Sequence, residues 1–293
     1  MDYKKKFQER QQFRKKQERK MMETILYFLT YFIIYSFAGW VLESVSKSIA
    51  QKKLVNSGFL NGPICPIYGF GALIMLLSLN ALKEKPLILF IAAFIMLSAW
   101  EYIVGVLLEK IFKTKYWDYS HLKFNFQGRI CLKNSIYWGI LGVVFICYIH
   151  PFIESYIKTI PIDLLLYLDI ILGITIIVDL IVSAIAVTNF ETMINKINDM
   201  GITIKEKVKE LKELKDKNKQ KIINIEKSAI ENAENKIKEL KISQAKLKLR
   251  IYRQANRLKK AFPSMKSETI TKFLNQKIDL KKLKQNIKKK NKE

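Results

Sequence analysis

The sequence is poor in the residues that build crosslinks and metal centres. Its 293 residues include three cysteines and two histidines. Cys65, Cys131 and Cys147 form no C-x-x-C pair and no even set, so neither a disulfide framework nor a zinc site is expected. The G-x-x-x-x-G-K-[ST] pattern of a nucleotide-binding loop is absent as well, which excludes ATP hydrolysis by that route. We predict no metal, no cofactor and no enzymatic activity.

The middle of the chain has almost no net charge, and the positive charge is concentrated at its two ends. Residues 21–200 carry a net charge of +1, whereas residues 1–20 carry +6 and residues 201–293 carry +18. The middle is correspondingly apolar, and five of its stretches approach the roughly 18 to 20 residues that a spanning helix needs. These stretches are residues 24–46, 59–82, 86–109, 134–153 and 162–188. The first is too long for a signal peptide and is expected to be retained.

The second stretch begins with an unusual break, GFLNGPICPIYGFG at residues 58–71. Irregular backbone at membrane depth is tolerated only where it is buried in protein or lines a wet cavity. If all five stretches cross, 12 basic residues flank one face and 13 the other, and the charge rule gives no orientation. If residues 59–82 enter and leave on one side, the counts become 19 and 6. We therefore favour a re-entrant or broken second stretch, with a kinked fifth span as the alternative.

Five carboxylates lie within or beside the apolar stretches. They are Glu43, Glu101, Glu109, Asp169 and Asp179. An ionisable group at membrane depth costs about 2.5 to 3.5 kcal/mol on insertion scales, so it usually faces a partner or a wet cavity. Glu43 and Glu109 also fit a headgroup position. The other three are expected to line a functional site or to join a polar packing seam between helices, and the sequence leaves both readings open.

The segment between the third and fourth stretches mixes aromatic and polar residues. It contains Trp117, Asp118, Asn125 and Arg129, and no spacing typical of a catalytic triad. It is either an amphipathic interfacial stretch or the rim of a membrane site. Arg129 or Lys133 is a candidate interfacial partner for Glu101, Asp169 or Asp179.

Several motifs occur in order along the apolar region. They are GWVLE at 39–43, SGFLNGPICPIYGFG at 57–71, WDYS at 117–120 and NFQGRICLKNSIYWG at 125–139, followed by Pro151. This pattern resembles the bacterial membrane proteins named putative ABC-transporter permeases, of the CmpB-like type, over about residues 24–190. The resemblance implies a transport component and brings no substrate or catalytic residue with it.

The candidate site combines these motif positions with the carboxylates. The motif positions are Gly39, Glu43, Gly58, Asn61, Gly62, Pro63, Pro66, Tyr68, Gly69, Trp117, Asp118, Asn125, Gly128 and Arg129. Glu101, Glu109, Asp169 and Asp179 complete the set of candidate membrane-site residues.

The C-terminal tail lacks proline and glycine from residue 203 to residue 260 and alternates charges of both signs. Its apolar spacing predicts a long amphipathic helix, as a helical hairpin or a coiled coil. Pro263 marks a break, and Ser267 is a candidate cap for a short helix. The end of the chain is expected to be basic and disordered. Such a tail can contact anionic lipid headgroups or a protein partner, while its few aromatics disfavour nucleic acid.

Together these features predict an all-α polytopic membrane helix bundle with a helical C-terminal tail. The expected domains are a basic segment 1–22, a transmembrane domain 23–190, an amphipathic helix or coiled coil 191–262, and a short helix with a basic end 263–293. We predict a permease-like component of the cell membrane that needs a separate ATPase or a different energy source. The alternative is a membrane anchor for a basic coil. The N-terminus is expected in the cytoplasm, and so is the C-terminus if residues 59–82 are re-entrant.

Overall fold

The structure is a computed structural model that describes residues 2–218, 224–276 and 287. Its contacts divide the chain into two compact units. Unit 1 comprises Met1–Ala184 together with Lys260–Lys266, and unit 2 comprises Ile185–Lys259 together with Ser267–Glu293. Almost all of the apolar sequence falls in unit 1.

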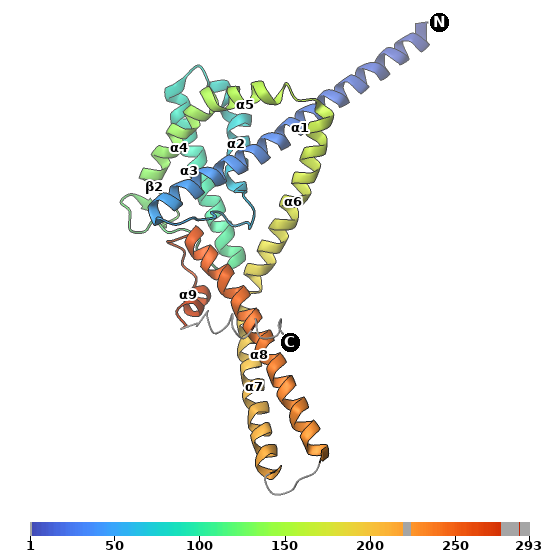
Figure 1. Ribbon diagram of the computed structural model, residues 1–293. Helices are drawn as coiled ribbons and strands as arrows, with labels where there is room; N and C mark the ends of the chain where they lie inside the picture. The colour runs from blue at the N-terminus through green and yellow to red at the C-terminus, as the bar shows by residue number, and fades with distance from the viewer. Residues whose placement is uncertain (1, 219–223, 277–286, 288–293) are drawn as a thin grey trace. The chain divides into compact units, whose positions relative to one another are not determined.

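Unit 1 is built from helices joined by short loops and one small hairpin (Figure 1). In chain order the elements are α1 (Asp2–Gln51), α2 (Pro66–Leu79), η1 (Asn80–Leu82), α3 (Pro86–Phe112), β1 (Asn125–Phe126), β2 (Ile130–Cys131), α4 (Leu132–Val144), η2 (Phe145–Ile149), α5 (His150–Ile157) and α6 (Ile162–Thr188). The π-helical turn η2 joins α4 and α5 into one continuous helical run. β1 and β2 pair antiparallel.

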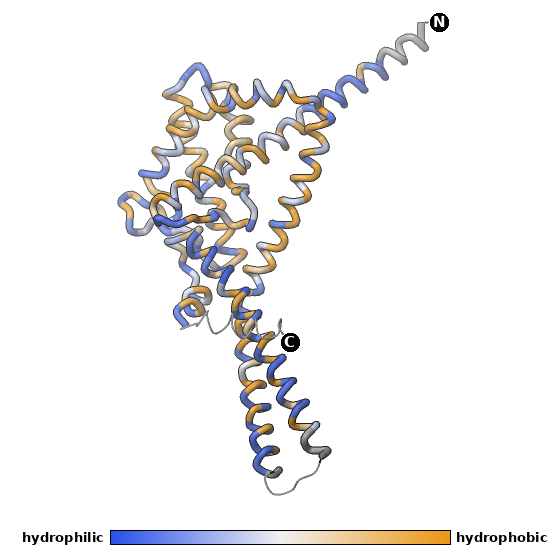
Figure 2. Tube along the Cα trace, in the orientation of Figure 1, coloured by the Kyte–Doolittle hydropathy of each residue, from blue (hydrophilic) through white to orange (hydrophobic). Residues whose placement is uncertain are grey.

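Four of the described helices are long and apolar enough to cross a membrane by length and composition. They are Arg10–Gln51 within α1, Pro86–Phe112, Leu132–Ile157 and Ile162–Thr188. Figure 2 shows the apolar colouring that these helices share and the polar colouring of the chain's N-terminal stretch. On α6, Ile171, Ile174 and Ile177 are exposed, as expected of a helix whose outer face meets lipid. The predicted all-α membrane bundle is confirmed at this level.

Local signals in the sequence fix where the central helices begin and end. Pro66 and Pro86 stand in the first turn of α2 and α3, where the missing N–H has no helical partner to lose. α3 ends at Lys113, whose φ of 51° is left-handed and stops the helix. The breaks around the second apolar stretch are therefore encoded locally.

α2 is shorter than the four long helices and begins part-way along them. The indole of Trp100, twelve residues before the end of α3, donates to the carbonyl of Ile67 at 3.0 Å. The Tyr68 hydroxyl reaches Glu43, eight residues before the end of α1, at 2.9 Å. Non-helical residues between α1 and α2 fill the part of the bundle's length that the shorter α2 does not cover. The predicted break in the second stretch is confirmed.

α2 runs antiparallel to the parts of α1 and α3 that it contacts, since Gly39 faces Tyr68 and Ser36 faces Gly69 (Figure 1). Together with η1 it forms a shorter apolar helix, Pro66–Leu82, beside the four helices that are long enough to span a membrane. Four spans with a broken second stretch were the favoured arrangement, and this much is confirmed. The sides on which the second stretch enters and leaves, and the side of each terminus, stay predictions.

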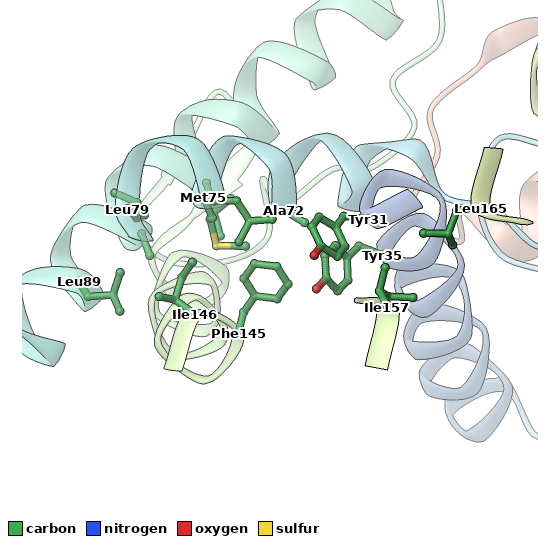
Figure 3. Packing of buried hydrophobic residues seen from close by; sticks show 13 residues of the cluster. Tyr31, Tyr35, Ala72, Met75, Leu79, Leu89, Phe145, Ile146, Ile157 and Leu165 are labelled. Carbon is green, nitrogen blue, oxygen red and sulfur yellow. The ribbon is translucent and has the colours of Figure 1, made fainter. Parts of the chain in front are cut away.

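The core of unit 1 lies where α1, α2, α3 and the α4–α5 run meet. Figure 3 shows Tyr31 and Tyr35 from α1, Met75 from α2 and Phe145 and Ile146 from η2 packed together. The Tyr35 and Phe145 rings meet edge to face, with centroids 4.8 Å apart. The same apolar cluster extends to Leu89, which is fully buried at the start of α3. Apolar packing thus holds the half of the bundle away from the break.

Near the break, α1 and α2 approach closely over two glycines. A Cβ on Gly39 would lie 2.3 Å from Cγ of Tyr68, and a Cβ on Gly69 would lie 2.1 Å from Oγ of Ser36. Each glycine leaves room for a side chain of the facing helix. Small residues serve this purpose at helix contacts in membrane proteins generally.

Unit 2 contains α7 (Phe190–Asn218), most of α8 (Asn224–Ala261) and α9 (Glu268–Leu274). α7 and α8 run antiparallel as a helical hairpin, in which Gln244 Nε2 donates to the carbonyl of Ile197 at 2.8 Å. Ser267 caps α9 by accepting from the amide of Ile270, as the sequence predicted. The hairpin form is confirmed, and supercoiling of the two helices stays a prediction. The predicted basic, disordered end lies outside the described residues except for residue 287.

The glycine contact between α1 and α2 can be tested by adding one methyl group. Gly39→Ala is expected to lower the free energy of unfolding by about 1–3 kcal/mol, the usual cost of overpacking. Gly173→Ala on α6 is the matched control, because its Cβ meets nothing within 4 Å. The control should be neutral or slightly stabilising, since alanine is favoured in helices. Thermal unfolding in detergent measures both, and equal melting temperatures for the two variants would contradict the close approach.

Candidate functional site at the broken helix entrance

The irregular backbone before α2 is held by a single carboxylate from α6. Asp179 accepts hydrogen bonds from the amide of Gly62 at 2.7 Å and from the amide and side chain of Asn61 at 3.2 and 3.0 Å. The Ser183 hydroxyl, one turn later, donates to the same carboxylate at 3.2 Å. Backbone donors without helical partners are costly in apolar surroundings, and a carboxylate satisfies several at once. Asp179 therefore acts as the cap of the break.

The other side of the break is tied to α1. The amide of Cys65 donates to the carbonyl of Ser36 at 3.0 Å. The indole of Trp40 donates to the side chain of Asn56 at 2.7 Å, and Asn56 in turn donates to the carbonyl of Asn61 at 2.7 Å. The stretch from 56 to 65 is thus fixed between α1 and α6 without forming a helix.

Glu43 stands where the end of α1, the break and the start of α2 meet. Its carboxylate accepts from Lys47 Nζ at 2.6 Å, from the Ser57 hydroxyl at 2.6 Å and from the Tyr68 hydroxyl at 2.9 Å. Lys47 also donates to Ser57 at 2.8 Å. The contacts join three segments of the chain through one carboxylate, which a headgroup position alone would not require.

Glu101 lies on α3, and its hydrogen-bond partners differ in kind from those of Glu43. It is 5% exposed, and its two oxygens accept from the Tyr119 hydroxyl at 3.0 Å and the Trp138 indole at 2.9 Å. Both donors are neutral, whereas Glu43 has an ammonium partner. One turn toward the bundle centre, Ser98 donates to Ser135 at 2.6 Å and extends a polar seam between α3 and α4. The seam expected as an alternative to a functional site is therefore present.

The two carboxylates belong to one polar cluster. The rings of Tyr68, which binds Glu43, and Trp138, which binds Glu101, lie 5.9 Å apart. We call these five residues, Glu43, Tyr68, Glu101, Tyr119 and Trp138, the motif cluster.

The segment between α3 and α4 covers the cluster as a structured rim. Trp117 donates to the carbonyl of Arg129 at 2.9 Å, and Arg129 pairs with Glu109 at 2.7 Å. Arg129 was a candidate partner for Glu101, Asp169 or Asp179, and the structure pairs it with Glu109 instead. Gly128 has a φ of +65°, and a Cβ there would lie 2.3 Å from the Asp118 carboxylate, so only glycine fits this turn. The Asn125 side chain accepts from the amide of Gly128 at 3.0 Å.

The structure brings most of the predicted residues together and leaves one apart. Glu43, Tyr68 and Glu101 lie in the motif cluster. The remaining motif positions shape the break, the α1–α2 contact or the rim, namely Gly39, Gly58, Asn61, Gly62, Pro63, Pro66, Gly69, Glu109, Trp117, Asp118, Asn125, Gly128, Arg129 and Asp179. Asp169 lies elsewhere, buried between α6 and α1, and accepts from the Thr30 hydroxyl at 2.6 Å. It joins two helices and contacts none of the cluster residues.

Sequence reasoning missed the donors that the carboxylates use. Tyr119 and Trp138 were not among the predicted site residues, yet each donates to Glu101. Both stand inside quoted motifs, WDYS and NSIYWG, and that position was the available signal. Among the described residues, no group of three or more His, Cys, Asp or Glu side chains is placed to hold a metal ion.

These features define a polytopic helical membrane protein with a polar site at the broken start of its second apolar stretch. A family model described as Putative ABC-transporter type IV matches residues 30–184, which is more than half of the chain. The chain belongs to this family, the CmpB-like family that its motifs predicted. No curated protein and no solved structure matches the chain.

Removing the Tyr119 hydroxyl tests whether Glu101 depends on its neutral donors. Tyr119→Phe leaves the buried carboxylate with Trp138 alone and is expected to lower the free energy of unfolding by about 1–3 kcal/mol. Tyr167→Phe on α6 is the control, since this side chain is 65% exposed, and its effect should stay within about 0.5 kcal/mol. Unfolding in detergent measures both. A Tyr119→Phe variant as stable as the control would contradict the contact.

Proposed function

We propose that this protein is the membrane-spanning component of an ABC-type transporter and that the motif cluster is where it handles its solute. One observation carries the proposal. Motifs scattered over about one hundred residues, from Gly39 to Gly139, meet around two carboxylates inside an apolar unit. Charged groups at membrane depth are costly and mark solute or ion pathways more often than they mark simple packing.

The composition of the cluster indicates which solutes fit. It offers two carboxylates, Glu43 and Glu101, and one nearby ammonium group, Lys47. The tyrosine hydroxyls and the tryptophan indole are donors that either carboxylate can exchange for donors of a solute. This balance favours a cationic or neutral hydrogen-bonding solute over an anion. The break before α2 supplies backbone that can shift without unwinding a helix.

Energy for transport has to come from outside this chain in the proposal. The sequence has no P-loop motif, so a separate ATPase subunit would bind ATP. The basic hairpin of unit 2 and the basic N-terminal stretch are suited to anionic lipid headgroups, at about 1 kcal/mol for each lysine or arginine near the surface. The hairpin is also a surface on which an ATPase or another protein could bind. We propose the cell membrane as the location.

A second candidate is a membrane anchor that presents the helical hairpin. It is favoured by the size of unit 2, which is helical and compact by itself. In that case the carboxylates of unit 1 would serve packing alone. The two candidates therefore differ in what they require of Glu43 and Glu101.

Conservative substitution of the two carboxylates tests the proposal. Cells lacking the gene are complemented with wild type, Glu43→Gln, Glu101→Gln or Glu84→Gln, the last an exposed control in the α2–α3 loop. Mass spectrometry and elemental analysis then compare the solutes in cells and medium. Wild type and the control should restore the same profile. The two cluster variants should change solute transfer at least about tenfold, the effect of about 1.4 kcal/mol of lost interaction.

Membrane abundance of each variant is measured in parallel by immunoblotting, so that a folding defect is recognised. If both cluster variants reach wild-type abundance and restore the full profile, the transport proposal is wrong and the anchor remains. If only Glu101→Gln fails to restore the solute profile, the proposed solute site is confined to Glu101 and its two donors, Tyr119 and Trp138.

A further inference from the structure

A short C-terminal segment, Lys260–Lys266, packs within unit 1 although it follows the whole hairpin in sequence. Its backbone forms a β-bridge with Lys115, in which each amide donates to the other carbonyl, at 3.0 and 2.8 Å. Gln51, at the end of α1, donates to the carbonyl of Lys260 at 2.9 Å. Ala261 and Met265 are buried by the contact. The segment is therefore fixed at both of its ends.

Side chains reinforce the backbone contact. Lys266 Nζ lies 2.6 Å from Asp118, and the amide of Asp118 donates to the Ser264 hydroxyl at 3.2 Å. The Phe262 ring meets the Tyr116 ring edge to face, with centroids 5.0 Å apart. Aromatic pairs of this kind contribute about 0.5–1.5 kcal/mol beyond their buried area. The contact combines a charge pair with an aromatic anchor.

The segment Lys260–Lys266 contacts residues that are linked to both carboxylates of the motif cluster. Lys47, which binds Glu43, lies over the Phe262 ring, 5.1 Å from its centroid. Asp118, which binds Lys266, immediately precedes Tyr119, the donor to Glu101. Two independent routes thus join the segment to the motif cluster.

The surface that receives the segment, Lys47, Gln51 and residues 114–118, falls inside the family match at 30–184, and the segment falls outside it.

We propose that Lys47, Gln51 and residues 114–118 form a docking site for the chain's own segment Lys260–Lys266, and that docking holds Lys47 and Tyr119 on the two cluster carboxylates. The occupant is a part of the same chain, so docking also closes residues 185–259 into a loop whose two ends are joined to unit 1. A ligand that pulls on this loop would act on the cluster through the segment. The inference does not depend on what the protein transports.

The charge pair remains formed over the physiological pH range. Burial by itself would raise the pKa of Asp118, but hydrogen bonds from Lys115, Lys266 and Ser120 hold that pKa below its usual range. A carboxylate with a depressed pKa in the folded state adds stability above its unfolded value of about 4 and loses it as the pH falls further. Docking should therefore be independent of pH from about 5 to 8. The Lys266 side chain is 67% exposed, so high salt should weaken the pair.

Hydrogen–deuterium exchange on the full chain in nanodiscs tests the docking. Lys266→Glu and Asp118→Lys should each speed exchange of the peptides that contain Lys115 and Lys266 by about tenfold, because each loses a charge-assisted contact. Lys266→Arg keeps the positive charge opposite Asp118 and should keep exchange slow. Lys272→Glu on α9, an exposed control, should leave it unchanged.

The link to the motif cluster needs a separate readout. The infrared carboxyl band that disappears in Glu101→Gln should shift in Lys266→Glu and stay at its wild-type position in Lys266→Arg. Unchanged exchange at Lys115 in both Lys266→Glu and Asp118→Lys would overturn the docking site. Faster exchange with an unshifted carboxyl band would overturn the connection to the cluster. Equal changes in Lys266→Arg and Lys266→Glu, at wild-type melting temperature, would also count against the proposal.

Discussion

The structure of unit 1 depends on satisfying irregular backbone inside an apolar bundle. Residues 56–65 are not helical, and Asp179 accepts three hydrogen bonds from their donors, two from the backbone amides of Asn61 and Gly62 and one from the Asn61 side chain. Once the break is secured there, α2 can begin part-way along α1 and α3. That shortened start brings Tyr68 to Glu43 and leaves room for the rim to reach Glu101. The polar site is thus a consequence of the break.

The two carboxylates of the motif cluster are held in different ways, and the difference gives the site its chemistry. Glu43 is neutralised by Lys47, whereas Glu101 relies on a phenol and an indole. A group held by neutral donors can exchange them for a solute without separating an ion pair. The docked segment Lys260–Lys266 adds control from the C-terminal side, because it contacts Lys47 and the neighbour of Tyr119. The motif cluster and the segment Lys260–Lys266 are thus connected through the partners of these two residues.

Much of this arrangement was predictable from sequence, and the rest was not, for physical reasons. Hydrophobic length predicted the long helices, proline and glycine predicted the break, and motif order predicted the family. The sides on which the second stretch enters and leaves are not decided by the sequence, because charge counts report only statistical preferences. Tyr119 and Trp138 were not predicted as site residues, because aromatic side chains serve both at interfaces and as buried donors. Lys266 carried no signal at all, since its partner Asp118 lies 148 residues earlier.

The most direct test of the account is whether the motif cluster opens to water in the membrane. Native Cys65 lies at the start of α2, is 3% exposed and interacts electrostatically with Glu43, so it reports on the site without a mutation there. With Cys131 and Cys147 replaced by serine, a small water-soluble thiol reagent is applied to intact membranes. A transport site must open during its cycle, so Cys65 should label measurably while a cysteine at lipid-facing Ile174 does not. Labelling of Cys65 only after denaturation would contradict a solute site and leave unit 1 as a sealed anchor.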